Sequence, residues 1–122
     1  MTETDFQAHV MRALNAPGRT TRFHRQNAGM FKSWDGRRPI HGAPKGASDL
    51  TGIAAPWGVR VELELKVAAP HTDEQKRWKR LIQRFGGIYV LARYDRAMSL
   101  EGNVAAVVAA VDVAIRDWGC ER

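Results

Sequence analysis

The most regular pattern of hydrophobic and polar positions lies in residues 59–67, where the two kinds alternate strictly. A period of two predicts a β-strand, because successive side chains of a strand point to opposite faces. One face would carry Val59, Val61, Leu63, Leu65 and Val67, and the other would carry Arg60, Glu62, Glu64 and Lys66. The pattern therefore predicts a strand with one apolar face and one charged face.

Hydrophobic residues at helical spacing predict three helices. The first covers residues 1–14, with Thr2 or Thr4 as its N-cap. The second begins at the capping-box sequence Thr72-Asp73-Glu74-Gln75, and the third covers residues 103–118. The positions expected to face the core are Phe6, Val10, Met11 and Leu14 in the first helix, Trp78, Leu81, Ile82 and Phe85 in the second, and Val104, Val107, Val108, Val111, Ile115 and Trp118 in the third.

Three more strands are expected, at residues 20–27, 47–54 and 88–92, and the last of these is apolar enough to be covered on both faces. Residues 28–47 contain many glycines and prolines and predict a loop, which is long enough to suggest a functional role. The predicted order is α-β-β-β-α-β-α. We expect one α/β domain over residues 1–122, with a small mixed sheet flanked by helices.

The charge balance narrows the class of partner. The chain has 19 Lys and Arg against 13 Asp and Glu, a formal net charge of +6 and a sequence pI near 10.1. This excess favours a polyanionic partner, nucleic acid first and an acidic membrane surface second. A single cysteine, Cys120, excludes an internal disulfide. With no apolar run of roughly 20 residues and no signal-peptide pattern, we expect a soluble, cytoplasmic protein.

The charged face of the 59–67 strand is the main candidate for chemistry. Pairing this strand with the 47–54 strand about Pro56-Trp57-Gly58 places Asp49 opposite Glu64, Leu65 or Lys66, depending on the register. Two carboxylates and the backbone carbonyl of Leu65 are oxygen ligands that suit Mg²⁺. Lys66 can orient or deprotonate a nucleophile beside the metal. This combination is typical of metal-dependent phosphodiester cleavage.

A structural explanation competes with this reading. Alternating charges on one strand face are commonly the solvated side of a half-buried sheet, and the tripeptide Glu-x-Lys is widespread in proteins. Asp49 lies one hairpin away from Glu64-Leu65-Lys66, and this position favours the catalytic interpretation more than the tripeptide alone does. Glu62 lies nearer the turn, so we expect it either to support the site or to be solvated.

Two further residues carry a double interpretation. Glu3 shares the core-facing side of the first helix, where a carboxylate needs a partner such as a metal site, but it can also simply offset the helix dipole. Gln75 occupies the N3 position of the capping box, which explains it fully. It also precedes Trp78 by three residues, so its amide could face the sheet and hold a water or a phosphate.

Other common sites are missing from the sequence. The four histidines form no zinc-ligand grouping, and His24 with Asn27 lacks the downstream ligand of a His-Asn-His nuclease. There is no P-loop, dinucleotide-binding fingerprint or Gly-x-Ser-x-Gly elbow. A basic helix face, formed by Lys76, Arg77, Lys79, Arg80 and Arg84, either tracks phosphates or is merely solvated.

The order and spacing of these motifs resemble the VRR-NUC domain of the PD-(D/E)xK nuclease superfamily. The resemblance rests on an early helix acid, Arg25-Gln26-Asn27, Gly46-Ala47-Ser48-Asp49-Leu50, Glu64-Leu65-Lys66 and Thr72-x-x-Gln75, and it covers nearly the whole chain. Ser48 stands where many relatives have proline, which restricts backbone φ. Stand-alone copies look like phage or prophage proteins.

The resemblance implies a restriction-endonuclease-like core and a DNA endonuclease that depends on Mg²⁺ or Mn²⁺. Asp49 and Glu64 would bind the metal with the Leu65 carbonyl, Lys66 would be the catalytic lysine, Glu3 would match the helix acid, and Gln75 would match the helix glutamine. Small phage members are similar to Holliday-junction resolvases, which implies branched DNA as substrate. The expected DNA contacts are Arg25, Asn27, Lys32, Arg37, Arg38, Lys45 and Lys76.

We also expect a homodimer, because symmetric cleavage of a junction needs two active sites. The apolar stripe of the last helix, with Trp34 and Trp57, supplies candidate dimer surface, although the stripe could equally pack on the sheet of its own chain. Two other readings stay open. One is a monomeric nickase or flap nuclease, and the other is a DNA-binding module without catalysis.

Overall fold

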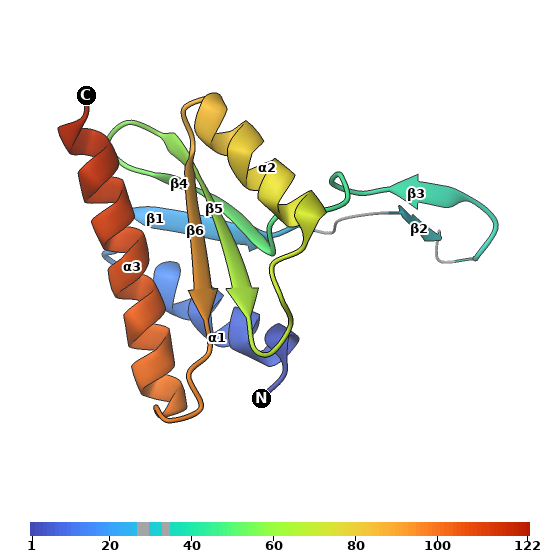
Figure 1. Cartoon of the computed structure of the whole chain (residues 1–122), viewed down its shortest axis with the longest axis horizontal. Coiled ribbons are helices and arrows are strands. Elements are labelled where there is room, and N and C mark those ends of the chain that lie inside the picture. The colour runs from blue at the N-terminus through green and yellow to red at the C-terminus, as the bar shows by residue number, and fades with distance from the viewer. Residues whose placement is uncertain (27–29, 33–34) are drawn as a thin grey trace.

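The computed structural model describes residues 1–26, 30–32 and 35–122, and these residues form helices on both faces of a sheet (Figure 1). The helices are α1 (Glu3–Leu14), α2 (Asp73–Arg84) and α3 (Leu100–Cys120). The strands are β1 (Thr21–Arg25), β2 (Met30–Lys32), β3 (Pro39–His41), β4 (Leu50–Ala54), β5 (Val59–Lys66) and β6 (Ile88–Arg93).

The main sheet has four strands in the order β1-β4-β5-β6 among the residues described. β1 and β5 pair antiparallel with the two edges of β4, and β6 pairs parallel with β5. A parallel pair needs a crossover connection, and α2 supplies it between β5 and β6. The predicted α/β architecture, a small mixed sheet flanked by helices, is confirmed.

The apolar face of the sheet packs against α1 and α3, and α2 covers part of the opposite face (Figure 1). Helix α1 buries Phe6, Val10 and Leu14 completely, because these residues recur on one side of the helix. Leu63 and Leu65 of β5 are also completely buried. α2 and α3 both contact β6, so the expectation that this strand is covered on both faces is confirmed.

The long loop predicted for residues 28–47 is in part a second sheet. β2 and β3 pair antiparallel, with Met30 opposite His41 and Lys32 opposite Pro39, and this hairpin projects away from the main sheet (Figure 1). The predicted order α-β-β-β-α-β-α therefore lacks these two strands. Strands of three residues are too short to leave a periodic pattern in the sequence.

The predicted boundaries differ from the observed ones where side chains replace backbone partners. β4 begins at Leu50 instead of residue 47, because the Asp49 carboxylate accepts the Leu65 N–H that strand pairing would otherwise use. α3 begins at Leu100 instead of residue 103, since Ser99 caps it through the Gly102 N–H. Thr2 is the N-cap of α1, which settles that alternative.

The apolar stripe predicted for α2 is wrong at two positions. Ile82 is buried, but Leu81 and Phe85 are 38% and 75% exposed. The reason is that α2 covers the charged face of β5, where Trp78 donates to Glu62 through its indole N–H. The polar side chains on this face of β5 leave a narrower area for apolar contact with α2 than a second apolar core would.

The apolar stripe of α3 packs inside its own chain. Val107 and Val111 are buried, and Val104, Val108, Ile115 and Trp118 pack against the core. Trp57 meets Trp118 edge to face, with ring centroids 5.3 Å apart, and Trp34 lies outside the described residues. Val104 and Val108 of the stripe also line a groove between α1 and α3, and the homodimer stays a prediction. Within the part of the chain that is described, no helix has the length and apolarity to cross a membrane.

Candidate active site

The two candidate carboxylates meet where β4 begins beside β5. The register pairs Leu50 with Leu63, so Asp49 lies one step further, opposite Glu64, which is one of the three predicted partners. The Asp49 N–H donates to Glu64 Oε2 at 3.2 Å, and the Leu65 N–H donates to Asp49 Oδ2 at 2.8 Å. Each carboxylate is thus held by a backbone amide of the other strand, which fixes the pair without a flexible partner.

Lys66 lies against the same pair and is buried with it. Its Nζ is 3.4 Å from Glu64 Oε1, and Glu64 and Lys66 are 1% and 4% exposed. The competing explanation, a solvated charged face, is wrong for these two residues and for Glu62, which is fully buried. A buried charge destabilises the folded state unless it is paired or hydrogen-bonded. Glu64 and Lys66 therefore depend on these contacts.

Gln75 caps α2, and its side-chain amide also faces the sheet, where its partner is Glu64. Its Oε1 accepts the Thr72 N–H at 2.9 Å while the Thr72 hydroxyl accepts the Gln75 N–H, which completes the capping box. Its Nε2 donates to Glu64 Oε1 at 2.8 Å. One side-chain amide thus caps the N-terminus of α2 and orients the Glu64 carboxylate. A substitution of Gln75 therefore changes both the helix cap and the site.

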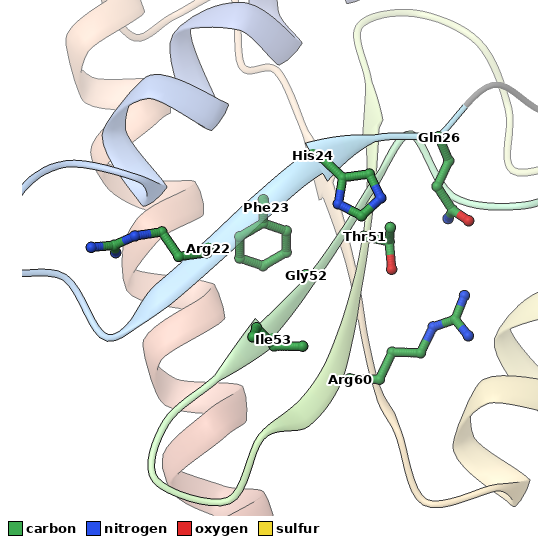
Figure 2. Close-up of a pocket in the computed structure, with 8 residues that line it drawn as sticks. All are labelled: Arg22, Phe23, His24, Gln26, Thr51, Gly52, Ile53 and Arg60. Atoms are coloured by element: carbon green, nitrogen blue, oxygen red, sulfur yellow. The ribbon is translucent and has the colours of Figure 1, made fainter.

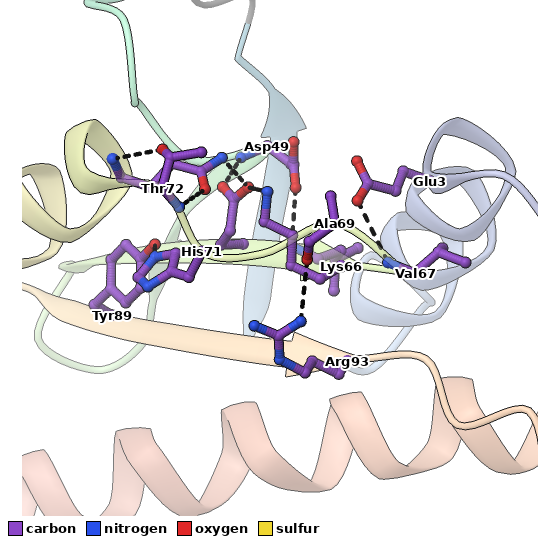
Figure 3. A network of polar contacts seen from close by, with 12 residues as sticks. Glu3, Asp49, Lys66, Val67, Ala69, His71, Thr72, Tyr89 and Arg93 are labelled. Carbon is purple, nitrogen blue, oxygen red and sulfur yellow. Dashed lines mark hydrogen bonds and ion pairs between the residues drawn. The ribbon is translucent and has the colours of Figure 1, made fainter.

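Glu3 stands at the margin of the site (Figure 3). Its Oε1 accepts the Val67 N–H at 3.3 Å, where β5 has just ended. The Glu3 charge also raises the pKa of Asp49, although burial is the larger cause. Glu3 therefore does more than offset the dipole of α1, because it joins the start of α1 to the end of β5.

The segment that leads to Asp49 is held by close backbone contacts, and one of these contacts requires a glycine. Gly46 has a φ of +92°, and a Cβ there would lie 2.6 Å from the backbone of Glu74 in α2. Only glycine allows both the conformation and the close approach. The Gln26 N–H then donates to the Asp49 carbonyl at 2.9 Å. These contacts fix the direction in which the chain enters β4 from Asp49.

Glu62 forms a second buried carboxylate centre that the sequence did not identify as one. Its Oε1 accepts from Trp78 Nε1 at 2.7 Å and from Gln26 Nε2 at 2.9 Å, and its Oε2 lies 3.3 Å from Arg60 Nε. Gln26 also donates to the Ser48 carbonyl at 3.2 Å, directly before Asp49. Glu62 thus connects α2, β1 and the Asp49 segment. No local pattern indicated this, since the donors come from distant segments.

His71 and Tyr89 lie next to Lys66 and were also missed (Figure 3). His71 Nε2 and the Tyr89 hydroxyl are 2.9 Å apart. Burial and the nearby positive charges, Lys66 first among them, lower the pKa of His71, so the imidazole is neutral near pH 7. Burial raises the pKa of Tyr89 above its usual range. The only sequence signal was the position of His71 directly before the capping box.

The electrostatics of the carboxylate pair favour protonation or a bound cation. Burial raises the pKa of Glu64 to about 8, repulsion from Asp49 adds to the rise, and the attraction of Lys66 opposes it. Burial also raises the pKa of Asp49, against the hydrogen bond from Leu65. Two carboxylates that repel each other away from water do not ionise independently, so a positive charge beside them stabilises their ionised forms.

The oxygen donors fit a small divalent cation. Among the described residues, no three His, Cys, Asp or Glu side chains form a metal-ligand group, so Glu3 does not complete one with the pair. Mg²⁺ usually takes one or two protein carboxylates and keeps several waters. The N–H and C=O of a strand residue point to the same side, so the carbonyl of Leu65 lies on the side of Asp49. Asp49, Glu64 and this carbonyl are suitable ligands.

The predicted DNA contacts are spread around this site. Lys45 lies beside the start of α2, 3.6 Å from Glu74, and Lys76 is exposed on the same helix. Arg37 and Arg38 are exposed in the turn between β2 and β3, and Arg25 donates to the Thr4 carbonyl at 3.3 Å. Asn27 and the side chain of Lys32 lie outside the described part of the chain.

Neither a scan against protein-family models nor a search of curated proteins found a match to this chain. The resemblance to VRR-NUC domains thus rests on the motifs alone, and the function has to be inferred from the site.

Without metal, we expect the free energy of unfolding to fall as the pH rises from about 5 to about 8. Native Glu64 keeps its proton up to about pH 8, whereas an unfolded glutamate loses it near 4.5, so the native state binds the extra proton in this window. Raising the pH removes that proton and disfavours the native state. Thermal or urea unfolding across this pH range in EDTA measures the effect.

Glu64→Gln should flatten this pH dependence, because the neutral amide cannot titrate. Glu121→Gln is the matched control, since Glu121 is exposed at the end of α3, and it should keep the dependence. An equal slope in wild type and Glu64→Gln would show that Glu64 is ionised throughout, contrary to its burial.

Proposed function

We propose that this chain is a DNA endonuclease that hydrolyses phosphodiester bonds with Mg²⁺ or Mn²⁺, built on a PD-(D/E)xK core of the VRR-NUC type. The observation that carries the proposal is the convergence of half-buried Asp49 with buried Glu64 and Lys66, and the amide of Gln75 on Glu64. The cationic chain supports a polyanionic substrate. We propose branched DNA as the preferred form.

A non-catalytic DNA-binding module explains this site less well. Binding DNA needs exposed cations, whereas Glu64 and Lys66 are almost completely buried. Burying two carboxylates beside each other reduces stability, as the raised pKa of Glu64 indicates. Such a cost is typical of a functional site.

The chain's own residues would divide the hydrolysis between them. Asp49, Glu64 and the Leu65 carbonyl would hold the cation, which would supply charge stabilisation on the phosphate and lower the pKa of a water. Lys66, fixed against Glu64, would orient the attacking water and offset negative charge as the water oxygen bonds to phosphorus. The attacking water gives a proton to solvent, the ester P–O bond breaks, and the leaving oxygen takes a proton from solvent. Gln75 keeps Glu64 in its metal-binding orientation.

Asp49→Asn and Lys66→Ala should each lower the cleavage rate by about 10²-fold or more, because both residues act on the same reacting phosphate. The double variant should be no worse than the more damaged single variant, since the residues act as a unit. Cleavage of four-way junction, flap, nicked and linear DNA, with and without Mg²⁺ or Mn²⁺, measures this.

Asp117→Asn is the control for these variants, because Asp117 is an exposed acid of α3. DNA binding in EDTA and the melting temperature should be recorded for every variant. Substantial Mg²⁺-dependent cleavage by Asp49→Asn would refute the assignment.

Comparing Gln75→Ala with Thr72→Ala should separate capping from catalysis. Both substitutions break the capping box and should destabilise the protein by about 1 kcal/mol. Only Gln75→Ala removes the hydrogen bond to Glu64, so only this variant should cleave more slowly and need more Mg²⁺ for half-maximal activity. Metal titrations of cleavage and thermal melts measure both effects. Equal activity in the two variants would mean that Gln75 serves the helix cap alone.

We further propose a homodimer, because one chain supplies a single carboxylate pair and a symmetric cut needs two sites. Sedimentation velocity at micromolar concentration, with and without junction DNA, should show the mass of two chains. A monomer in both conditions would contradict the dimer and favour a nickase or flap nuclease.

A further inference from the structure

A groove lies on the part of the charged sheet face that α2 leaves uncovered (Figure 2). It has a volume of about 570 Å³ and is formed by β1, β4 and the start of β5. The side chains that matter here are Arg22, His24, Gln26, Thr51, Ile53 and Arg60. Two arginines and a histidine line the groove, and none of the described residues that line it carries a carboxylate. The groove therefore favours an anionic occupant.

The strand register connects this groove to the carboxylate pair in three successive rows. Ile53 pairs with Arg22 on one side and Arg60 on the other, which makes the first row. In the second row, Thr51 lies between His24 and Glu62. In the third, Asp49 lies between Gln26 and Glu64, through the hydrogen bonds Gln26 N–H to Asp49 carbonyl and Asp49 N–H to Glu64. The groove thus leads directly to the candidate active site.

The spacing of these rows suits a nucleic-acid strand. Two residues along a strand span about 7 Å, so the first row lies about 14 Å from Asp49. A strand of duplex DNA advances about 3.4 Å per phosphate along the helix axis, so a groove that runs parallel to this axis would span roughly four nucleotides. The arginines of the first row would then meet phosphates a few nucleotides from the cleaved bond.

The side chains of the groove are available for such contacts. Arg60 is 52% exposed in its side chain and uses its Nε towards Glu62, so other N–H groups of the guanidinium remain for a phosphate. Arg22 is exposed at the far end, where one of its Nη atoms holds the carbonyls of Arg19 and Thr21. Ile53 lies in the first row and is 58% exposed. Figure 2 shows His24, Thr51 and Arg60 around the same opening.

We infer that this groove binds the sugar–phosphate backbone of the substrate nucleic acid next to the cleaved bond, with Arg22 and Arg60 as phosphate contacts. The inference rests on the proposed nuclease function for the identity of the ligand. It adds a binding surface distinct from the β2–β3 hairpin and from the basic face of α2. Arg60 further connects the groove with Glu62, whose partner Gln26 holds the Asp49 segment.

The decisive variant is Ile53→Glu, with Ile53→Gln as its matched control. Ile53 makes no hydrogen bond through its side chain and is largely exposed, so both substitutions keep the fold and differ by one negative charge. Anisotropy of labelled duplex and four-way junction DNA in EDTA measures binding without cleavage. Ile53→Glu should bind DNA about fivefold or more weakly than Ile53→Gln at low salt, because a carboxylate would face phosphates.

Arg22→Gln and Arg60→Gln should each reduce the slope of log affinity against log salt by about one, as expected for a lost phosphate contact. Arg116→Gln is the control, since Arg116 is an exposed arginine on α3. Arg60→Lys should restore most of the binding. Melting temperatures show whether loss of the Arg60 contact with Glu62 has changed the fold.

Equal DNA affinity of Ile53→Glu and Ile53→Gln would overturn the inference, as would a wild-type protein that binds neither DNA. If the groove variants change binding of labelled polyglutamate but not of DNA, the occupant is an acidic protein and the inference also fails. Groove-dependent DNA binding without cleavage under any metal would keep the groove and refute the nuclease. Cleavage that depends on Asp49, with unchanged binding in the groove variants, would keep the nuclease and refute the groove.

Discussion

The burial of Glu64 is the constraint on which the rest of this structure depends. Its carboxylate accepts from the Asp49 backbone and from Gln75, and Lys66 lies 3.4 Å away. These partners come from β4, α2 and β5, so a buried charge that is costly by itself brings three elements together. The same contacts leave the carboxylate beside that of Asp49, and its burial, with repulsion from Asp49 added, keeps its pKa high. Stability and chemistry therefore oppose each other at one residue.

Glu62 extends this principle along the same face of the sheet. It is fully buried, and its partners Trp78, Gln26 and Arg60 connect α2 with β1 and with the surface of β5. An α-helix is about 10 Å wide and neighbouring strands lie about 4.8 Å apart, so α2 over β5 and β6 leaves β1 and β4 uncovered. This is why the face has a closed half, which holds the candidate active site, and an open half, which forms the groove.

The two faces of β5 therefore have different roles, one in the hydrophobic core and one in the polar site. The apolar face packs under α1 and α3 and carries the core, while the charged face is buried in hydrogen bonds and ion pairs. Groups that must be fixed accurately are best placed on rigid elements. Here Glu64 and Lys66 stand on a central strand whose other face is locked by packing, and Asp49 is held by the strand beside it.

The sequence by itself determined the helices and the strands of the main sheet, and it limited the partner of Asp49 to Glu64, Leu65 or Lys66, because periodicity, caps and hairpin geometry are local. It did not determine that the charged face of β5 is buried. Alternation is the same whether α2 or water covers that face, so only tertiary packing could distinguish the two. The Glu62 centre, the His71–Tyr89 pair and the groove were also invisible, since their members are distant in the chain. The exposed Leu81 and Phe85 have the same cause, because a helical stripe does not reveal how wide its partner surface is.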